Sequence, residues 1–121
     1  MLNCFAVGLG GFIGAVLRYL ISLIPIKNPE SFPVNTFIIN VIGAFAIGCI
    51  AFAVTKNENM DSRLLLFLKV GICGGFTTFS TFALETSDLI KNGSVAVALI
   101  YVAASVVLSV LAVMLPQFIF K

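Results

Sequence analysis

The sequence predicts an all-α integral membrane protein in which four transmembrane helices form a single domain over residues 1–121. Hydrophobic residues make up 60% of the chain and charged residues only 10%, whereas soluble domains average roughly 25% charged residues. The mean hydropathy is +1.16. Polar segments divide the chain into four apolar stretches, each near the roughly 20 helical residues that cross a bilayer.

The first two spans are expected at residues 4–24 and 34–54. The first stretch begins without a basic segment and is too long for the core of a signal peptide, so we expect it to be retained. Three prolines mark the polar connection at residues 25–33, where helices do not continue easily. Residues 56–62 form the most polar segment of the chain and are expected to be the second loop.

The last two spans are expected at residues 63–90 and 95–120, with a short turn at residues 91–94. Four spans place both termini on one side of the membrane. Basic residues in short loops orient membrane proteins, and here they are nearly balanced between the two faces. One face carries the N-terminus, Lys56, Arg63, Lys69 and Lys121, and the other carries Lys27, Lys91 and Arg18.

This balance leaves two interpretations open. Either other features set the orientation, or the chain inserts both ways and pairs antiparallel. Small residues one helical turn apart let helices approach closely, and they add support for association between helices. The same spacing also suits packing within one subunit, which we favour for at least one pair. The pairs are Gly10 and Gly14, Ala44 and Gly48, and Gly71 and Gly75.

Residues 74–82, with the sequence GGFTTFSTF, lie near the middle of the third span. Glycine, β-branched and hydroxyl residues combine poor helix propensity with local hydrogen bonding to the backbone, so we predict a kink or break here. Carbonyl groups released between Gly74 and Thr77 need protein, water or an ion as partner in a bilayer, and broken helices elsewhere bind ions in this way. The alternative is a Gly/Thr-rich helix contact without an ion.

Phe79 and Phe82 lie three residues apart, a spacing that is ordinarily typical of packing against lipid or a neighbouring helix. Here, however, Ser80 and Thr81 lie between the two rings and more threonines precede them. Aromatic ring edges are electropositive. A path lined by these rings and hydroxyl groups would therefore attract a small anion without a fixed positive charge that traps it.

Two other spans carry polar residues at helical spacing. Thr36 and Asn40 are four residues apart in the second span, and Tyr101, Ser105 and Ser109 form a hydroxyl stripe along one face of the fourth. Such a stripe can line a wet path. An amide deep in the membrane needs hydrogen-bond partners, so Asn40 either serves that path or holds helices together.

Several function classes are not expected. The three cysteines, Cys4, Cys49 and Cys73, are widely spaced among apolar residues, which suggests no disulfide or metal framework. Histidine, the side chain used most often for acid–base chemistry near neutral pH, is absent, and no nucleophile, base and orienting group are seen together, so an enzyme is least expected. The basic residues are scattered singly, unlike the clusters of a nucleic-acid binder.

Three blocks follow in order along the chain: GGFIGAVLRY at residues 10–19, VNTFIINVIG at residues 34–43 and GGFTTFSTF at residues 74–82. In these blocks the chain resembles the Fluc (CrcB) family of fluoride ion channels. The resemblance implies a dual-topology antiparallel homodimer in the plasma membrane of a prokaryote. Such a dimer exports fluoride passively through two pores and confers fluoride resistance.

The resemblance also implies roles for individual residues. A central structural Na⁺ would be held by backbone carbonyls of Gly74 and Thr77 from both subunits. Glu85 fits the family pattern, but no role is assigned to it from the sequence. The implied fluoride pathway has Phe79 and Phe82 as the aromatic pair facing the ion, Asn40 as donor, Thr36, Tyr101, Ser105 and Ser109 as a polar track, and Arg18 at the vestibule. We also place the hydroxyl groups of Ser80 and Thr81, between the two rings, in the predicted pathway.

Two rival functions belong to other classes. A small multidrug-resistance transporter is also a four-helix dual-topology dimer, but it depends on an acidic residue in the first span, and this chain has no Asp or Glu before Glu30. A non-transporting assembly subunit would explain the glycine pairs and leave the polar residues within the spans without a role. The fluoride channel is therefore the function that we expect.

Overall fold

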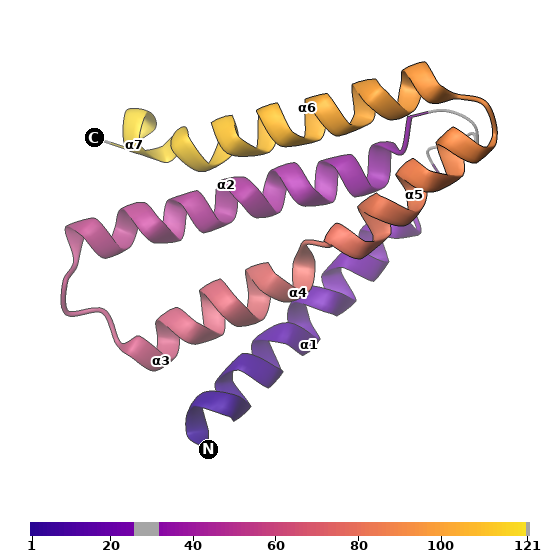
Figure 1. Ribbon diagram of the computed structural model, residues 1–121. Coiled ribbons are helices and arrows are strands. Elements are labelled where there is room, and N and C mark those ends of the chain that lie inside the picture. Colours follow the sequence, from indigo (N-terminus) through magenta and orange to yellow (C-terminus); the bar gives the residue numbers. More distant parts are fainter. Residues whose placement is uncertain (26–31, 121) are drawn as a thin grey trace.

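The computed structural model describes residues 1–25 and 32–120 and has only helices in this part of the chain. Four helical segments are long and apolar enough to cross a membrane, which confirms the predicted all-α membrane fold. Lys27 and Lys121, two of the basic residues in the charge balance, lie outside the described residues. Both described ends of the chain lie at the end of the molecule that carries the connection between the second and third spans (Figure 1).

The second and fourth spans lie side by side (Figure 1). They are α2 (Val34–Lys56) and α6 (Val95–Met114), and the short helix α7 (Pro116–Ile119) continues α6. A side chain at Gly48 of α2 would meet the backbone of α6, because its Cβ would lie 2.9 Å from the Cα of Val113. The small residue therefore serves contact within one chain.

The first span, α1 (Leu2–Ser22), packs on the first half of the third span through glycines of both segments. A Cβ at Gly71 would lie 2.9 Å from the Cα of Gly10, and a Cβ at Gly75 would lie 2.6 Å from the carbonyl oxygen of Gly11. A Cβ at Gly14 would collide with the backbone of the third span as well. Backbone touches backbone here, so these glycines are also used within the subunit, in agreement with the packing that we favoured for at least one pair.

The third span is broken, as predicted, but not at its glycines. It consists of α3 (Ser62–Leu65), the π-helix η1 (Leu66–Cys73), α4 (Gly74–Phe76) and α5 (Phe79–Lys91). Both glycines of the GGF triplet are helical, and the chain becomes extended at Thr77 (φ −82°, ψ 158°) and Thr78 (φ −149°, ψ 120°). The π-helical stretch before the glycines was not predicted from the sequence.

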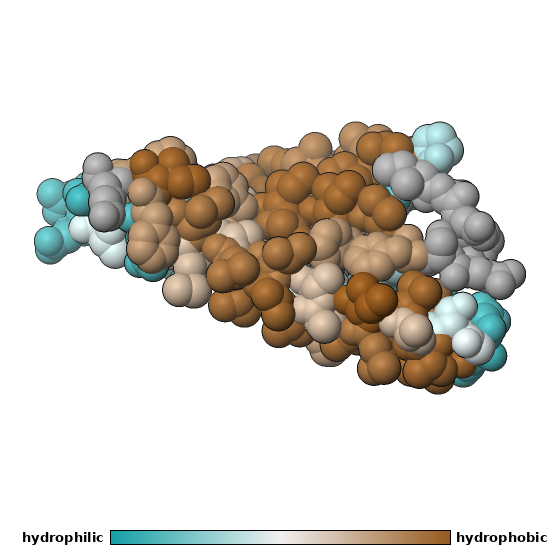
Figure 2. Space-filling view, turned by 90° about the horizontal axis from the view of Figure 1, so that it is seen from above, coloured by the Kyte–Doolittle hydropathy of each residue, from teal (hydrophilic) through white to brown (hydrophobic). Residues whose placement is uncertain are grey.

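Large apolar side chains cover the outside of the molecule, and hydrophilic residues gather at its two ends (Figure 2). Phe5 and Leu99, for example, expose 68% and 66% of their surface. In water this surface would be costly, whereas lipid is a suitable solvent for it. A small buried core of Leu89, Ala98 and Tyr101 joins α5 to α6, and Phe37 and Phe82 pack against it.

Candidate ion pathway

A cavity of about 410 Å³ opens between α2, the broken third span and α6. It gathers five of the residues predicted for the fluoride pathway together with both residues predicted for the sodium site. Its lining consists of Asn40, Gly43, Ala44, Ile47, Cys73, Gly74, Thr77, Thr78, Phe79, Phe82, Ser105, Val106, Ser109, Val110 and Val113.

Asn40 fastens α2 to the break in the third span. Its Nδ2 donates to the carbonyl oxygen of Thr78 at 3.1 Å, and its Oδ1 accepts from the backbone N–H of Thr78 at 2.8 Å. Neither group of Thr78 has a helical partner, because the chain is extended at this residue. Asn40 thus holds helices together, one of the two roles left open from the sequence, and its second Nδ2 hydrogen is left over for another acceptor.

Thr78 also begins the second half-helix of the third span. Its Oγ1 accepts a hydrogen bond from the backbone N–H of Thr81 at 3.1 Å, which caps α5 in the way that threonine commonly does. Ser80 is exposed, and its Oγ lies 3.4 Å from the same hydroxyl oxygen. Ser80 and Thr81 are not among the residues that line the cavity, so their place is in the cap beside it.

The carbonyl groups of Gly74 and Thr77 suit a small cation. The N–H of Thr77 still donates to the carbonyl of Cys73 in the helical pattern, whereas that of Thr78 donates to Asn40 instead of Gly74, so the helical pattern ends at Thr77. Within residues 1–25 and 32–120 no hydrogen bond to the carbonyl oxygens of Gly74 or Thr77 is found. The same ranges contain no group of three or more His, Cys, Asp or Glu side chains suited to a metal. The free oxygens at this site are thus backbone carbonyls, the hard ligands that an alkali cation takes.

Phe79 and Phe82 form a tilted pair, with ring centroids 5.6 Å apart and an interplanar angle of 44°. Phe79 is 79% exposed. Phe82 is half-buried, and its ring centroid lies 5.0 Å from that of Tyr101 in the core. Both rings line the cavity, so one is free on the surface of the single chain while the other is anchored to α6.

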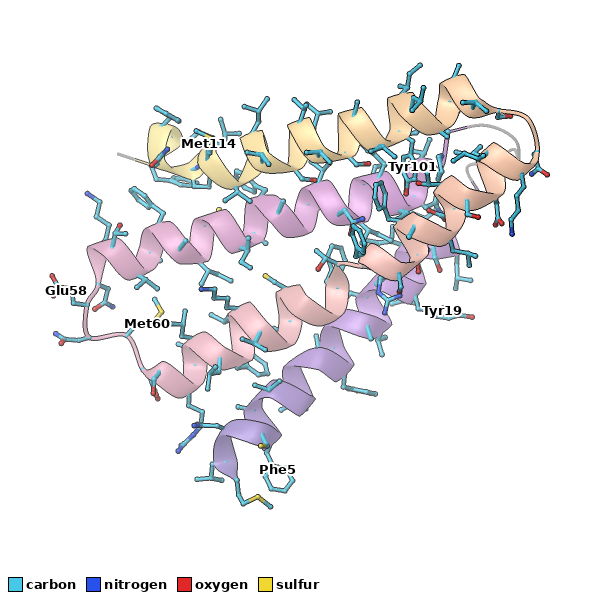
Figure 3. The ribbon with its side chains drawn as sticks, in the orientation of Figure 1. Phe5, Tyr19, Glu58, Met60, Tyr101 and Met114 are labelled. Atoms are coloured by element: carbon cyan, nitrogen blue, oxygen red, sulfur yellow. The ribbon has the colours of Figure 1, made fainter. Side chains whose placement is uncertain are left out.

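The hydroxyl stripe of α6 divides into two parts. Ser105 and Ser109 line the cavity, and the buried Oγ of Ser105 has no hydrogen-bond partner among the described residues. Tyr101 is fully buried instead, and its side chain points from α6 toward α2 and α5 (Figure 3). Ser105 and Ser109 thus offer hydrogen-bond donors to the cavity, whereas the hydroxyl of Tyr101 is bonded to another side chain.

Glu85 of α5 accepts the hydrogen bond of Tyr101. The hydroxyl of Tyr101 donates to Oε1 of Glu85 at 2.9 Å, and the hydroxyl of Thr36 donates to Oε2 at 3.0 Å. The half-buried carboxylate thus joins α2, α5 and α6, a role that the sequence alone could not assign. Thr36 and Tyr101, both predicted for the pathway, lie beside the cavity rather than in its lining.

Arg18 does not line the cavity either. Its Nε donates to the carbonyl oxygen of Gly75 at 3.1 Å, and the side chain is half-buried. Tyr19, the next residue, points away from the bundle (Figure 3). The guanidinium predicted for a vestibule is therefore bound to backbone next to the break.

Asn35 is a positioning residue that the sequence reasoning missed. Its Nδ2 donates to the carbonyl oxygens of Ile21 and Ile24, at 3.0 and 2.9 Å, and so ties the end of α1 to the start of α2. Carbonyl groups at the end of a helix lack helical partners. An asparagine directly after a proline-marked connection was the available signal for such a contact.

A family model described as "CrcB-like protein, Camphor Resistance (CrcB)" matches residues 5–117. Several proteins named fluoride-specific ion channel FluC are similar to this chain. The one from Ruminiclostridium cellulolyticum is 41% identical over 122 residues, which cover 100% of this chain and 94% of that protein. The one from Methylobacterium radiotolerans is 42% identical over 93% of this chain and 80% of that protein. The one from Clostridium perfringens (strain ATCC 13124) is 47% identical over 78% of this chain and 75% of that protein.

These relatives are bacterial, and the four apolar helices of the chain are long enough to cross a membrane. The protein is accordingly a multi-pass protein of a prokaryotic plasma membrane. Its sequence blocks, its broken third helix and the match over nearly its whole length agree. The chain belongs to the CrcB family.

Proposed function

We propose that this chain is a subunit of a fluoride-specific ion channel that exports fluoride passively and is not an enzyme. The observation that carries the proposal is that one cavity is lined by an amide, two phenylalanine rings and two serines, Asn40, Phe79, Phe82, Ser105 and Ser109. The fluoride specificity printed in the names of the relatives supports the same function.

The physical problem for such a channel is dehydration of the ion. Fluoride is small and strongly hydrated, so a narrow path must replace its water with donors that bind without trapping. Asn40 has one N–H left after its bond to Thr78, and the hydroxyl of Ser105 has no partner among the described residues. The ring edges of Phe79 and Phe82 add weak positive potential without a full charge.

The functional unit that we propose is an antiparallel homodimer with two pores. Support comes from what one chain leaves open: Phe79 and Gly74 are exposed beside carbonyls without hydrogen-bond donors. Lipid has no donor to offer them, so a second subunit is a suitable cover. Near balance of the basic residues between the two faces agrees with insertion in both orientations.

We further propose that Na⁺ is held where two subunits meet, by the carbonyl oxygens of Gly74 and Thr77 from each. A bound cation supplies the positive charge that these oxygens lack. The chain's own residues position these carbonyl groups: Asn40 holds the backbone of Thr78, and the side chain of Thr78 caps α5.

A small multidrug-resistance transporter is the weaker candidate. The relatives are named as fluoride channels, which favours the channel. The first span has no Asp or Glu, and Glu85 in the third span is tied to Thr36 and Tyr101. An assembly subunit without transport leaves the polar lining of the cavity unexplained.

Fluoride efflux from proteoliposomes tests the proposal. Vesicles loaded with potassium fluoride should release it only when valinomycin lets potassium follow, because a channel moves charge without a coupled ion. Proton-driven exchange of a cationic drug, or efflux of chloride as fast as that of fluoride, would contradict a fluoride-specific channel.

A further inference from the structure

The guanidinium of Arg18 is joined to the broken helix by a specific bond between named atoms. Its Nε donates to the carbonyl oxygen of Gly75, 57 positions away in the sequence, at 3.1 Å. Gly75 lies in the last helical turn before the extended residues Thr77 and Thr78, where carbonyls lose their helical donors. Arg18 thus supplies a donor to a backbone group that the break sets free.

The packing of α1 fixes this bond in place. Gly11 and Gly75 are in backbone contact, since a Cβ at Gly75 would lie 2.6 Å from the carbonyl oxygen of Gly11 and 3.0 Å from its Cα. Gly14 is likewise in contact with the backbone of the third span. The arginine therefore projects from a helix that lies directly against the break.

Charge favours the same arrangement. The first half-helix of the third span ends at Phe76, and a helix C-terminus carries partial negative charge that a cation stabilises. A hydrogen bond from a charged donor is also roughly twice as strong as one between neutral groups. An intramembrane arginine needs such a partner, because its charge is costly in lipid.

We propose that Arg18 is a positioning residue of the break: its Nε holds the Gly75 carbonyl within the chain, so that the Gly74 and Thr77 carbonyls remain for a small cation between two subunits. This role differs from that of a vestibule charge that attracts fluoride. It rests on the proposed channel and its sodium ion, and it predicts that the position of one N–H group matters more than the charge.

Two substitutions separate the donor from the charge. In glutamine, Nε2 follows Cδ just as Nε does in arginine, so Arg18→Gln keeps an N–H at the bonding position and removes the charge. In lysine a methylene stands at that position and the amine lies one bond beyond, so Arg18→Lys keeps the charge and displaces the donor. Arg18→Met removes both. Arg63→Gln is the matched control, because the other arginine of the chain is exposed in α3.

The measurement is thermal unfolding of each purified variant in detergent while sodium is exchanged for N-methylglucamine at constant ionic strength. The readout is the sodium concentration that gives half of the stabilisation. Arg18→Gln and Arg63→Gln should keep the midpoint of the parent protein within about threefold. Arg18→Lys and Arg18→Met should raise it at least about tenfold, the loss expected for one hydrogen bond.

The opposite ranking would overturn the proposal. A parent-like midpoint in Arg18→Lys with a shifted one in Arg18→Gln would show that charge is what matters. A parent protein whose unfolding ignores sodium would also overturn it, because the free carbonyls would then have no ion to hold. Fluoride efflux is measured separately, so a parent that binds sodium without passing fluoride would contradict the proposed function and leave the positioning role supported.

Discussion

Glu85 shows what spacing along a sequence cannot reveal. Tyr101, Ser105 and Ser109 lie on one face of α6, yet Tyr101 donates to Glu85 while Ser105 and Ser109 line the cavity. The hydroxyl of Thr36 is taken by the same carboxylate. Two of the hydroxyl groups predicted for the pathway therefore orient a carboxylate beside the cavity, and two are free to meet an ion inside it.

Asn40 is predicted to matter for stability as well as for conduction. Asn40→Ala leaves the N–H and C=O of Thr78 without partners, so the free energy of unfolding should fall by about 1–3 kcal/mol. Thermal or denaturant unfolding in detergent measures the change. Asn59→Ala, in the exposed loop between α2 and α3, is the control and should stay within about 0.5 kcal/mol. Equal stability of the two variants would refute the bridging role.

Substitutions of Phe79 and Phe82 are predicted to affect fluoride efflux alike but protein stability differently. Phe79→Ile and Phe82→Ile should each lower fluoride efflux, by about tenfold, because isoleucine has no electropositive ring edge. Only Phe82→Ile should also lower stability, since Phe82 packs on Tyr101 whereas Phe79 is 79% exposed. Efflux and unfolding are measured on the same preparations. Unchanged efflux in both variants would remove the rings from the pathway.

At the scale of elements, composition predicted the four helices and a break of the third one within residues 74–82, but not the particular residues at which the break falls. The glycines of the GGF triplet stay helical because their missing side chains are used for contact with α1. The break falls instead at Thr77 and Thr78, whose side chains form hydrogen bonds with nearby backbone groups. Thr77 Oγ1 donates to the carbonyl oxygen of Cys73, and Thr78 caps α5. The π-helix η1 has no periodicity that the sequence could reveal, since nearly every residue in it is apolar.

The contact between α1 and the third span is predicted to depend on glycine at particular positions. Gly14→Ala places a methyl group against the backbone of the third span, so the folded protein should lose about 1–3 kcal/mol. Gly8→Ala is the control on the same helix, because a Cβ there meets nothing within 4 Å, and it should be neutral or stabilising by up to about 1 kcal/mol. Similar melting temperatures for both variants would show that this packing is loose.

At the scale of the whole molecule, one chain leaves its own pathway open. The cavity has exposed Phe79 on one side and free carbonyls beside it, and lipid offers no hydrogen-bond donor to the carbonyls. The sequence suggested antiparallel pairing only through its balanced charges and its resemblance to a family. The glycines of its small-residue pairs gave no further support, because they pack within the chain.

Dual topology is predicted to give a specific labelling pattern. Asn57→Cys and Asn92→Cys, in a background with Cys4, Cys49 and Cys73 replaced by Ala, lie at opposite ends of the molecule, after α2 and after α5. An impermeant thiol reagent added outside sealed cells should label about half of each, because each end faces outward in half of the chains. Complete labelling of one position with none of the other would establish a single orientation.

We propose that fluoride passes through the cavity between α2, the broken third span and α6. A thiol reagent can test this directly on Ser109→Cys in the same cysteine-free background, since Ser109 lines the cavity. Asn92→Cys, exposed in the turn before α6, is the control. Fluoride efflux from proteoliposomes should stop when Ser109→Cys is modified and continue when Asn92→Cys is modified. Undiminished efflux through fully modified Ser109→Cys would contradict the pathway.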